Sequence, residues 1–261
     1  MKIDHLQPED WIHKDTQWVQ RGIRLFLARP GRWWMRYRGY GHQPRVPETG
    51  GFLLAPAPHG AFGDPFIYGL GQPRRQLRFM AKYQAIEWPI LGRMMRWAGG
   101  FPVHRGGDRS SRGLGIAQRV LESGDGLVIF MEGHLVLEDD GLGTPRNGLA
   151  YLALKTGVPV VPAAAWGSKR ARAYGRAWWN HWPRTTVVWG EPLQFERDDA
   201  PSEERIVEVR DEIWSHVTRC FEQAKAIAHH PNGRPPAGTP LDEALAGSGW
   251  TSPASAERPT T

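Results

Sequence analysis

Short apolar segments alternate with amphipathic segments between residues 50 and 193 of the chain. The apolar segments have the length and composition of buried strands and occupy residues 51–57, 76–82, 101–105, 126–133, 158–166 and 185–193. Apolar residues recur at helical spacing in residues 89–99, 113–124 and 147–157, and each of these segments ends at a glycine. Strands that alternate with helices of this length predict an α/β fold with a mostly parallel central sheet flanked by helices.

The regions on either side of this alternating part differ from it in composition, and we expect three regions in all. Residues 1–45 form an N-terminal segment rich in Trp and Arg. Residues 46–228 form one globular domain, which ends in a helix predicted from Ser202 to Ala228. Residues 229–261 are rich in Pro, Gly, Ser and Thr, a composition that predicts a disordered tail.

The N-terminal segment combines aromatic and apolar residues with six arginines between Trp11 and Arg38. Pro30 and Gly31 are expected to divide it into two pieces, of which the first is helical. Such a mixture is typical of an amphipathic helix that lies on a membrane surface. The alternative is an ordinary surface helix packed on the domain, with the chain's 13 Trp used mainly as core residues.

Composition narrows the cellular setting and the kind of partner. The formal net charge of +6 and the pI near 9.7 favour anionic partners such as nucleic acid, lipid headgroups or phosphorylated substrates. The single cysteine, Cys220, excludes an intramolecular disulfide and is expected to be buried in the last helix. Neither an apolar run long enough to span a bilayer nor a signal peptide is found, so we expect a cytoplasmic protein with peripheral membrane contact.

A histidine followed five positions later by an aspartate is a possible general base with its orienting carboxylate. The spacing occurs three times, as His5 with Asp10, His59 with Asp64, and His134 with Asp139. The middle pair lies in HGAFGDP, a glycine-rich turn directly after a predicted strand, where α/β sheets place their active sites. Spacing does not distinguish the three pairs, but this context favours His59 and Asp64.

Three later blocks follow HGAFGD in a fixed order, and the four together carry a resemblance. They are GGFPVHR at 99–105, VIFMEG at 128–133 and VPVVP at 158–162. With RFMAK, PILGRMMRWAG and the late GEP, they resemble the glycerolipid acyltransferase family that includes the 1-acylglycerol-3-phosphate acyltransferases. The resemblance covers about residues 52 to 192. It implies transfer of a fatty acyl group from an acyl thioester to the hydroxyl of a lysophospholipid, as in phospholipid synthesis.

The resemblance also implies a role for each matching residue. His59 would be the general base on the acceptor hydroxyl, and Asp64 its orienter. The implied acceptor-binding residues are Gly100, Phe101, Arg105, Glu132, Gly133 and Arg146, with Arg105 on the phosphate. Pro159 and Pro162 would shape the wall that receives the acyl donor, which is acyl-CoA or an acyl carrier protein. No bound cofactor, no metal and no covalent intermediate are implied.

The chain departs from the family's pattern at several positions. Pro58 and Ala61 stand where Asn and Ser are common, and Met131 stands where Pro precedes the Glu. His134 and Leu135 replace a Thr-Arg step whose arginine often contacts phosphate. The resemblance therefore implies the type of reaction more firmly than the identity of the acceptor. The alternatives are an acyltransferase with another acceptor and a catalytically inactive membrane-associated scaffold of the same fold. Nucleic-acid binding is disfavoured, because the basic residues are spread along the chain without a binding motif.

Overall fold

The computed structural model describes residues 17–41, 46–60, 64–71, 75, 77–88, 91–97, 99–103, 108–136, 141–168 and 184–252. A seven-stranded sheet forms its centre, in the order β1-β7-β6-β2-β5-β3-β4. The strands are β1 (Arg38–Gly41), β2 (Phe52–Ala57), β3 (Leu77–Lys82), β4 (Gly100–Val103), β5 (Gly126–Val128), β6 (Val160–Trp166) and β7 (Thr186–Trp189). All neighbouring strands pair in parallel except β6 and β7, so β1 and β7 run opposite to the other strands. The predicted α/β fold with a mostly parallel sheet is confirmed.

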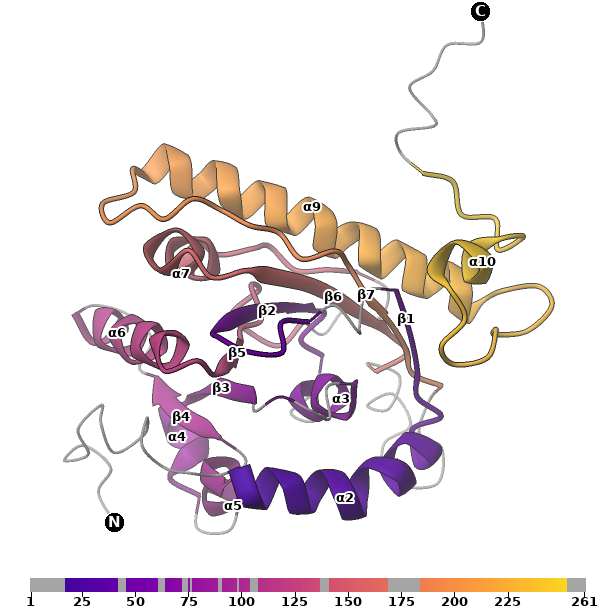
Figure 1. Ribbon diagram of the computed structural model, residues 1–261, viewed down its shortest axis with the longest axis horizontal. Helices are drawn as coiled ribbons and strands as arrows, with labels where there is room; N and C mark the ends of the chain where they lie inside the picture. The colour runs from indigo at the N-terminus through magenta and orange to yellow at the C-terminus, as the bar shows by residue number, and fades with distance from the viewer. Residues whose placement is uncertain are drawn as a thin grey trace, which may run out of the picture.

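Helices cover both faces of the sheet (Figure 1). They are α2 (Gln17–Trp34), α3 (Asp64–Gly71), α4 (Tyr83–Ile86), α5 (Leu91–Trp97), α6 (Asp108–Glu122), α7 (Gly148–Thr156), α9 (Glu203–Ala228) and α10 (Leu241–Leu245). The helices α6, α7 and α9 pack on one face, whereas α3 and the end of α2 pack on the other. None of the described helices is both long enough and apolar enough to cross a bilayer.

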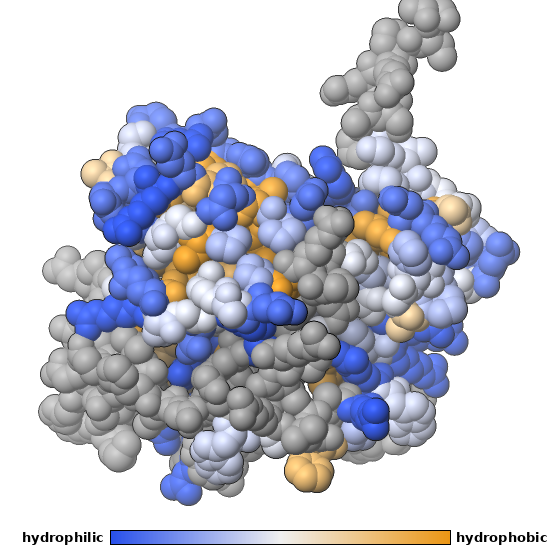
Figure 2. All heavy atoms as spheres, viewed as in Figure 1, coloured by the Kyte–Doolittle hydropathy of each residue, from blue (hydrophilic) through white to orange (hydrophobic). Residues whose placement is uncertain are grey.

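The long helix α9 follows directly from its sequence. The Ser202 hydroxyl accepts a hydrogen bond from the Arg205 N–H at 3.2 Å, which caps the first turn. The apolar stripe of α9 is fully buried and includes Cys220, whose thiol has its pKa raised to about 12 by burial. The outer side of α9 is mostly hydrophilic, as Figure 2 shows. The prediction that Cys220 is a packing residue is therefore consistent with its place against the sheet.

The N-terminal segment differs from the sequence prediction in two ways. α2 continues through Pro30 and Gly31 instead of breaking there, and Pro30 lies on its exposed side, where water can replace the lost backbone hydrogen bond. β1 lies within the predicted segment 1–45, yet it is the edge strand of the sheet and pairs with β7. A boundary at residue 45 therefore does not separate the N-terminal segment from the central sheet.

Residues 229–252, which we predicted to be disordered, pack against the edge of the sheet. The Tyr40 hydroxyl and the Arg38 guanidinium each donate a hydrogen bond to the Pro235 carbonyl at 2.6 Å. Ala244 and Leu245 of α10 are buried in a cluster with Tyr40 and residues of α9. The composition misled the prediction because backbone carbonyls in a Pro-rich segment still accept hydrogen bonds from side chains of the domain. The predicted tail that remains, residues 253–261, lies outside the described part.

Candidate active site

The turn between β2 and α3 holds His59 and Asp64. All six residues of β2 are buried, and the chain leaves the sheet at Pro58. Asp64 is the first residue of α3, where the positive end of the helix dipole stabilises a carboxylate. The Asp64 Oδ2 accepts a hydrogen bond from the Gly60 N–H at 2.6 Å. The carboxylate is therefore held in one orientation beneath the turn that carries His59.

His59 faces this carboxylate with one side of its ring. The distance from His59 Nδ1 to Asp64 Oδ2 is 3.5 Å, longer than a formed hydrogen bond but within reach of small movements. The His59 side chain is 21% exposed, whereas that of Asp64 is 2% exposed. The arrangement is that of a partly accessible imidazole backed by a buried carboxylate.

Two aromatic residues that sequence reasoning missed fix the position of the imidazole. The Phe130 ring stacks on the His59 ring, with centroids 4.2 Å apart and planes inclined by 23°. The Tyr68 ring meets the Phe130 ring edge-on, and its hydroxyl donates to the Ala57 carbonyl at 2.9 Å. Burial raises the pKa of Tyr68 well above its usual value, so its hydroxyl stays protonated and remains a donor. Tyr68 lies four residues after Asp64, on the same side of α3, and this spacing could have pointed to it.

Glu132 connects the His59 turn to a loop that is distant in sequence. Its side chain is fully buried. One carboxylate oxygen, Oε2, accepts from the His59 N–H at 2.6 Å, and the other, Oε1, accepts from the Gly143 N–H at 2.9 Å. The His59 carbonyl in turn accepts from the Val136 N–H at 2.8 Å. Glu132 therefore joins the His59 N–H to the loop at Gly143, while Val136 holds the His59 carbonyl.

Replacing Glu132 with glutamine tests this positioning role. In Glu132→Gln the amide oxygen can accept one of the two hydrogen bonds, but the NH₂ group then faces the other backbone N–H. We expect a loss of about 2–3 kcal/mol in the free energy of unfolding, measured by urea denaturation. The control is Glu122→Gln on the exposed side of α6, which should change it by less than about 0.5 kcal/mol. Equal stability of Glu132→Gln and the parent protein would contradict the assignment.

Gly133 and Arg146 lie together at the side of this network. Gly133 has φ +68°, and a Cβ there would meet Cδ and Nε of Arg146 at 2.7 and 2.8 Å. The Arg146 N–H donates to the Met131 carbonyl at 2.8 Å, while its side chain is exposed. The structure thus brings the predicted residues His59, Asp64, Glu132, Gly133 and Arg146 into one region, and it places a cation beside the Glu-Gly step.

The other predicted positions are not placed in this network. Gly100 and Phe101 begin β4, which is separated from β2 by β5 and β3. Phe101 is buried in the core, and a Cβ on Gly100 would meet the Met95 carbonyl at 2.8 Å, so close packing explains both residues. Pro162 is buried within β6, where it pairs with Ala55. Arg105 lies outside the described residues.

No metal site is indicated in the part of the chain that the structure describes, where no group of three or more His, Cys, Asp or Glu side chains could hold an ion. The site offers a base, an orienting carboxylate and an exposed cation. These groups suit proton abstraction from a hydroxyl next to an anionic substituent.

Comparison with known proteins finds similarity to acyltransferases. The sequence model of the Acyltransferase family matches residues 40–166. The 1-acyl-sn-glycerol-3-phosphate acyltransferase of Bacillus subtilis is 25% identical over 177 residues, which are 67% of this chain and 84% of the relative. The enzyme of that name from Streptococcus pneumoniae is 23% identical, over 71% of this chain and 67% of the relative.

One further relative and one solved structure are also similar to this chain. The lyso-ornithine lipid O-acyltransferase of Pseudomonas aeruginosa is 25% identical over 84% of this chain and 74% of the relative. The crystal structure of the 1-acyl-sn-glycerophosphate acyltransferase PlsC from Thermotoga maritima shares the fold, with a TM-score of 0.61 and 23% identity. That similarity covers 81% of each chain. Residues 40–166 thus match the Acyltransferase family, and the four ordered sequence blocks, the fold and these relatives together support a PlsC-type glycerolipid O-acyltransferase.

Proposed function

We propose that this protein transfers a fatty acyl group from an acyl thioester to the hydroxyl of a lysophospholipid such as 1-acylglycerol-3-phosphate. The observation that carries the proposal is the His59–Asp64 pair, an imidazole backed by a buried carboxylate on the turn between β2 and α3. Two of the relatives bear the name of that activity, which supports the choice of acceptor. Phospholipid synthesis is the process that such a reaction serves.

In the proposed mechanism, His59 Nε2 removes the proton of the acceptor hydroxyl as the oxygen attacks the thioester carbonyl. The resulting tetrahedral intermediate collapses, the carbon–sulfur bond breaks, and the thiolate takes the proton from the imidazolium. Asp64 stabilises the imidazolium and keeps the Nδ1 side of the ring facing the carboxylate. Glu132 and Phe130 hold His59 in place without contacting the reacting atoms.

Arg146 is the exposed cation of the site and is proposed to bind the anionic part of the acceptor. Its side chain lies against Gly133, next to the position where Leu135 replaces the family's arginine. A guanidinium fork is well suited to a phosphate group. One relative is named for a lyso-ornithine lipid, so a zwitterionic acceptor is the competing assignment.

A panel of acceptors tests the proposal. The purified protein is incubated with radiolabelled acyl-CoA, or with an acyl carrier protein bearing the same chain, and with lysophosphatidic acid, lysophosphatidylethanolamine or lyso-ornithine lipid. We expect the highest kcat/KM with lysophosphatidic acid. Preference for lyso-ornithine lipid would reassign the acceptor. Failure with every acceptor and both donors, in a protein that still binds vesicles, would favour the inactive scaffold.

The reaction is proposed to take place at the cytoplasmic face of a membrane, to which the protein binds peripherally. Trp18, Phe26 and Trp33 of α2 are 74%, 79% and 82% exposed. At about 100° per residue they lie within an arc of about 80°, and Arg29 falls in the same arc. Exposed aromatic side chains flanked by arginine are typical of a helix that lies on an anionic bilayer.

Replacing these three residues tests the membrane contact. We expect the combined Trp18→Ser, Phe26→Ser and Trp33→Ser variant to bind anionic vesicles at least tenfold more weakly, since each buried aromatic contributes about 1.5–3 kcal/mol. Sedimentation with phosphatidylglycerol-containing vesicles measures the binding. The matched control replaces the same three residues with leucine. Because leucine is also apolar, this variant should retain most of the vesicle binding. Unchanged binding by the serine variant would refute the proposed contact.

A further inference from the structure

Four arginines meet at the edge of the sheet, where three segments that are distant in sequence join. The segments are the connection from α2 to β1, the residues that begin β7, and the C-terminal segment after α9. They contribute the arginine cluster, which consists of Arg36, Arg38, Arg184 and Arg234. The Arg38 N–H donates to the Thr185 carbonyl at 3.0 Å, and the Thr185 N–H donates to the Met35 carbonyl at 3.2 Å. Main-chain hydrogen bonds therefore fix the position of the cluster in the fold.

Arg234 connects the members of the cluster. Its guanidinium donates to the Thr185 carbonyl at 2.8 Å and to the Arg36 carbonyl, and its own carbonyl accepts from the Arg38 guanidinium. These acceptors are neutral, so they use some of the donors without compensating any charge. Arg234 Nε is buried and has no hydrogen-bond partner among the described residues. A buried donor of this kind is destabilising unless a ligand accepts from it.

The positive charge of the cluster is not compensated within the part of the chain that the structure describes. None of the four arginines forms an ion pair with a described carboxylate. The pKa of Arg234 is lowered to about 10, first by burial and then by the charges of the other arginines. An anion that binds between these groups would reduce their mutual repulsion and accept from the unused donors.

Arg36 stands at a position that favours glycine. It ends α2 with φ +45°, and the Tyr37 N–H donates to the Arg32 carbonyl at 2.8 Å, as in a Schellman motif. The left-handed residue of this motif is usually glycine, because a Cβ destabilises the conformation. The Arg36 side chain is exposed, so packing in the core does not explain an arginine here. Binding of a ligand through its charge does explain it.

The register of the strands places the cluster at the same edge of the sheet as His59. Arg38 pairs with Thr186, and Thr186 pairs with Trp166 at the end of β6. β6 runs parallel to β2, and Trp166 and His59 each lie two residues beyond the last pair of these two strands. Three strand spacings therefore separate Arg38 from His59, about 14 Å across the sheet.

We propose that the arginine cluster binds the phosphate of an anionic phospholipid in the membrane on which α2 lies. Trp33, 82% exposed, precedes Arg36 by three residues, so the cluster continues the aromatic face of α2, which leads directly into β1 (Figure 1). Guanidinium groups bind phosphate oxygens through paired hydrogen bonds. A headgroup held there turns the edge that carries His59 toward the bilayer, from which a lysophospholipid acceptor comes. The proposal rests on the membrane contact proposed above for α2.

A short-chain lipid tests the cluster without a membrane. Calorimetry with dihexanoylphosphatidylglycerol below its critical micelle concentration should show saturable binding to the parent protein. The double variant Arg36→Gly, Arg184→Gln should bind this lipid at least tenfold more weakly. The same variant should bind phosphatidylglycerol-containing vesicles at least tenfold more weakly and pure phosphatidylcholine vesicles as well as the parent does. Because glycine suits position 36, the variant should unfold at the parent's temperature or above it.

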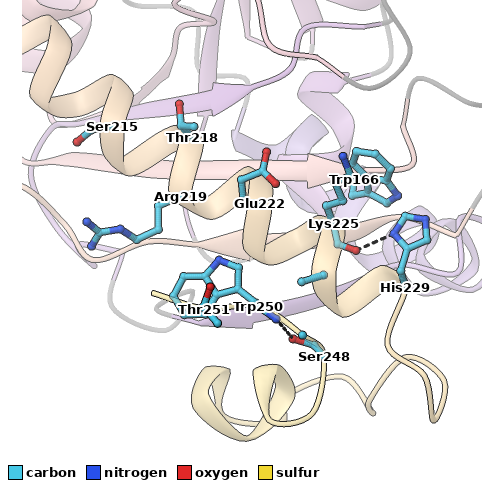
Figure 3. Close-up of a pocket in the computed structure, with 12 residues that line it drawn as sticks. Trp166, Ser215, Thr218, Arg219, Glu222, Lys225, His229, Ser248, Trp250 and Thr251 are labelled. Carbon is cyan, nitrogen blue, oxygen red and sulfur yellow. Dashed lines mark hydrogen bonds between the residues drawn. The ribbon is translucent and has the colours of Figure 1, made fainter. Parts of the chain in front are cut away.

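The charge-matched control is the double variant Arg219→Gln, Lys225→Gln. These two residues line a groove on the outer side of α9, across from Trp250, as Figure 3 shows. α9 packs on the face of the sheet opposite to the end of α2. The control removes the same number of positive charges and should change lipid and vesicle binding by less than about twofold.

Several outcomes would overturn the proposal. They are the absence of saturable lipid binding by the parent, equal weakening in the cluster variant and the charge-matched control, and a cluster variant that unfolds at a clearly lower temperature. Inorganic phosphate that competes at the same concentration as the lipid would assign the cluster to free phosphate and overturn the lipid assignment.

The experiment separates this site from the other proposals. If the serine variant of α2 binds vesicles like the parent while the short-chain lipid still binds to the cluster, the contact of α2 is wrong and the lipid site stands. Absence of acyl transfer to every acceptor would defeat the proposed reaction and leave both binding measurements interpretable.

Discussion

Replacing His59 with alanine is expected to reduce acyl transfer by about 10²- to 10⁴-fold, the contribution that a positioned general base makes. The imidazole is the group whose Nε2 can take the acceptor proton, and alanine cannot replace it. The fold should survive, because the hydrogen bonds of residue 59 to Glu132 and Val136 are made by its main chain. Initial rates with saturating acyl donor and lysophosphatidic acid measure the effect, and thermal unfolding verifies the fold.

The chain supplies a matched control for this experiment. His5 begins the same His-x4-Asp spacing, and His5→Ala should transfer acyl groups at the parent rate. A His59→Ala protein that is as active as the parent would remove the basis of the mechanism. Equal losses in the two variants would mean that histidine substitution damages the protein in a way unrelated to a general base.

The second large effect is expected from Asp64→Asn, which keeps the shape of the side chain but removes its charge. One oxygen of Asp64, Oδ2, both accepts from the Gly60 N–H and faces His59 Nδ1, so the asparagine oxygen can take its place but without the negative charge. Loss of the charge destabilises the imidazolium that forms when His59 takes the acceptor proton. By analogy with the same exchange in a serine-protease triad, kcat should fall by roughly 10³- to 10⁴-fold.

Kinetics distinguish this effect from a loss of binding. We expect KM for the acceptor to change by less than about threefold, because Asp64 is buried beneath the imidazole and orients it. The double variant His59→Ala, Asp64→Asn should be no slower than His59→Ala, since Asp64 acts through His59. Asp10→Asn, from the N-terminal His-x4-Asp pair, is the control. A raised acceptor KM with unchanged kcat would make Asp64 a binding residue and not an orienter.

The fold was predictable where the residues of a segment themselves indicate its secondary structure. The apolar strands and the glycine-terminated helices of residues 50–166 appear close to their predicted positions, because burial on both faces of a parallel sheet leaves continuous apolar runs. The antiparallel pairing of β6 and β7 has no such signal, since it depends on the path of the connecting residues. Order in residues 229–252 likewise depends on Arg38, Tyr40 and a buried cluster that are distant in sequence.

The candidate site also has a part that the sequence predicts and a part that only the structure shows. His59 and Asp64 could be selected from three identical spacings because they follow a strand within a glycine-rich turn. Stacking of Phe130 on His59 and the two hydrogen bonds of Glu132 could not be predicted in this detail, because they join segments that meet only in the folded protein. The sequence blocks therefore predict candidate site residues, and the structure shows which of them lie near His59 and which contacts hold its turn in place.

The bond between the His59 N–H and Glu132 spans 73 positions of the chain, and the second bond of that carboxylate reaches Gly143. During synthesis, the ribosome therefore releases His59 and Asp64 well before the residues that fix them. A nascent or truncated chain that ends before residue 132 has both members of the proposed catalytic pair but lacks the carboxylate that holds the turn. Competence for acyl transfer should thus arise only after the second half of the domain has been synthesised and folded.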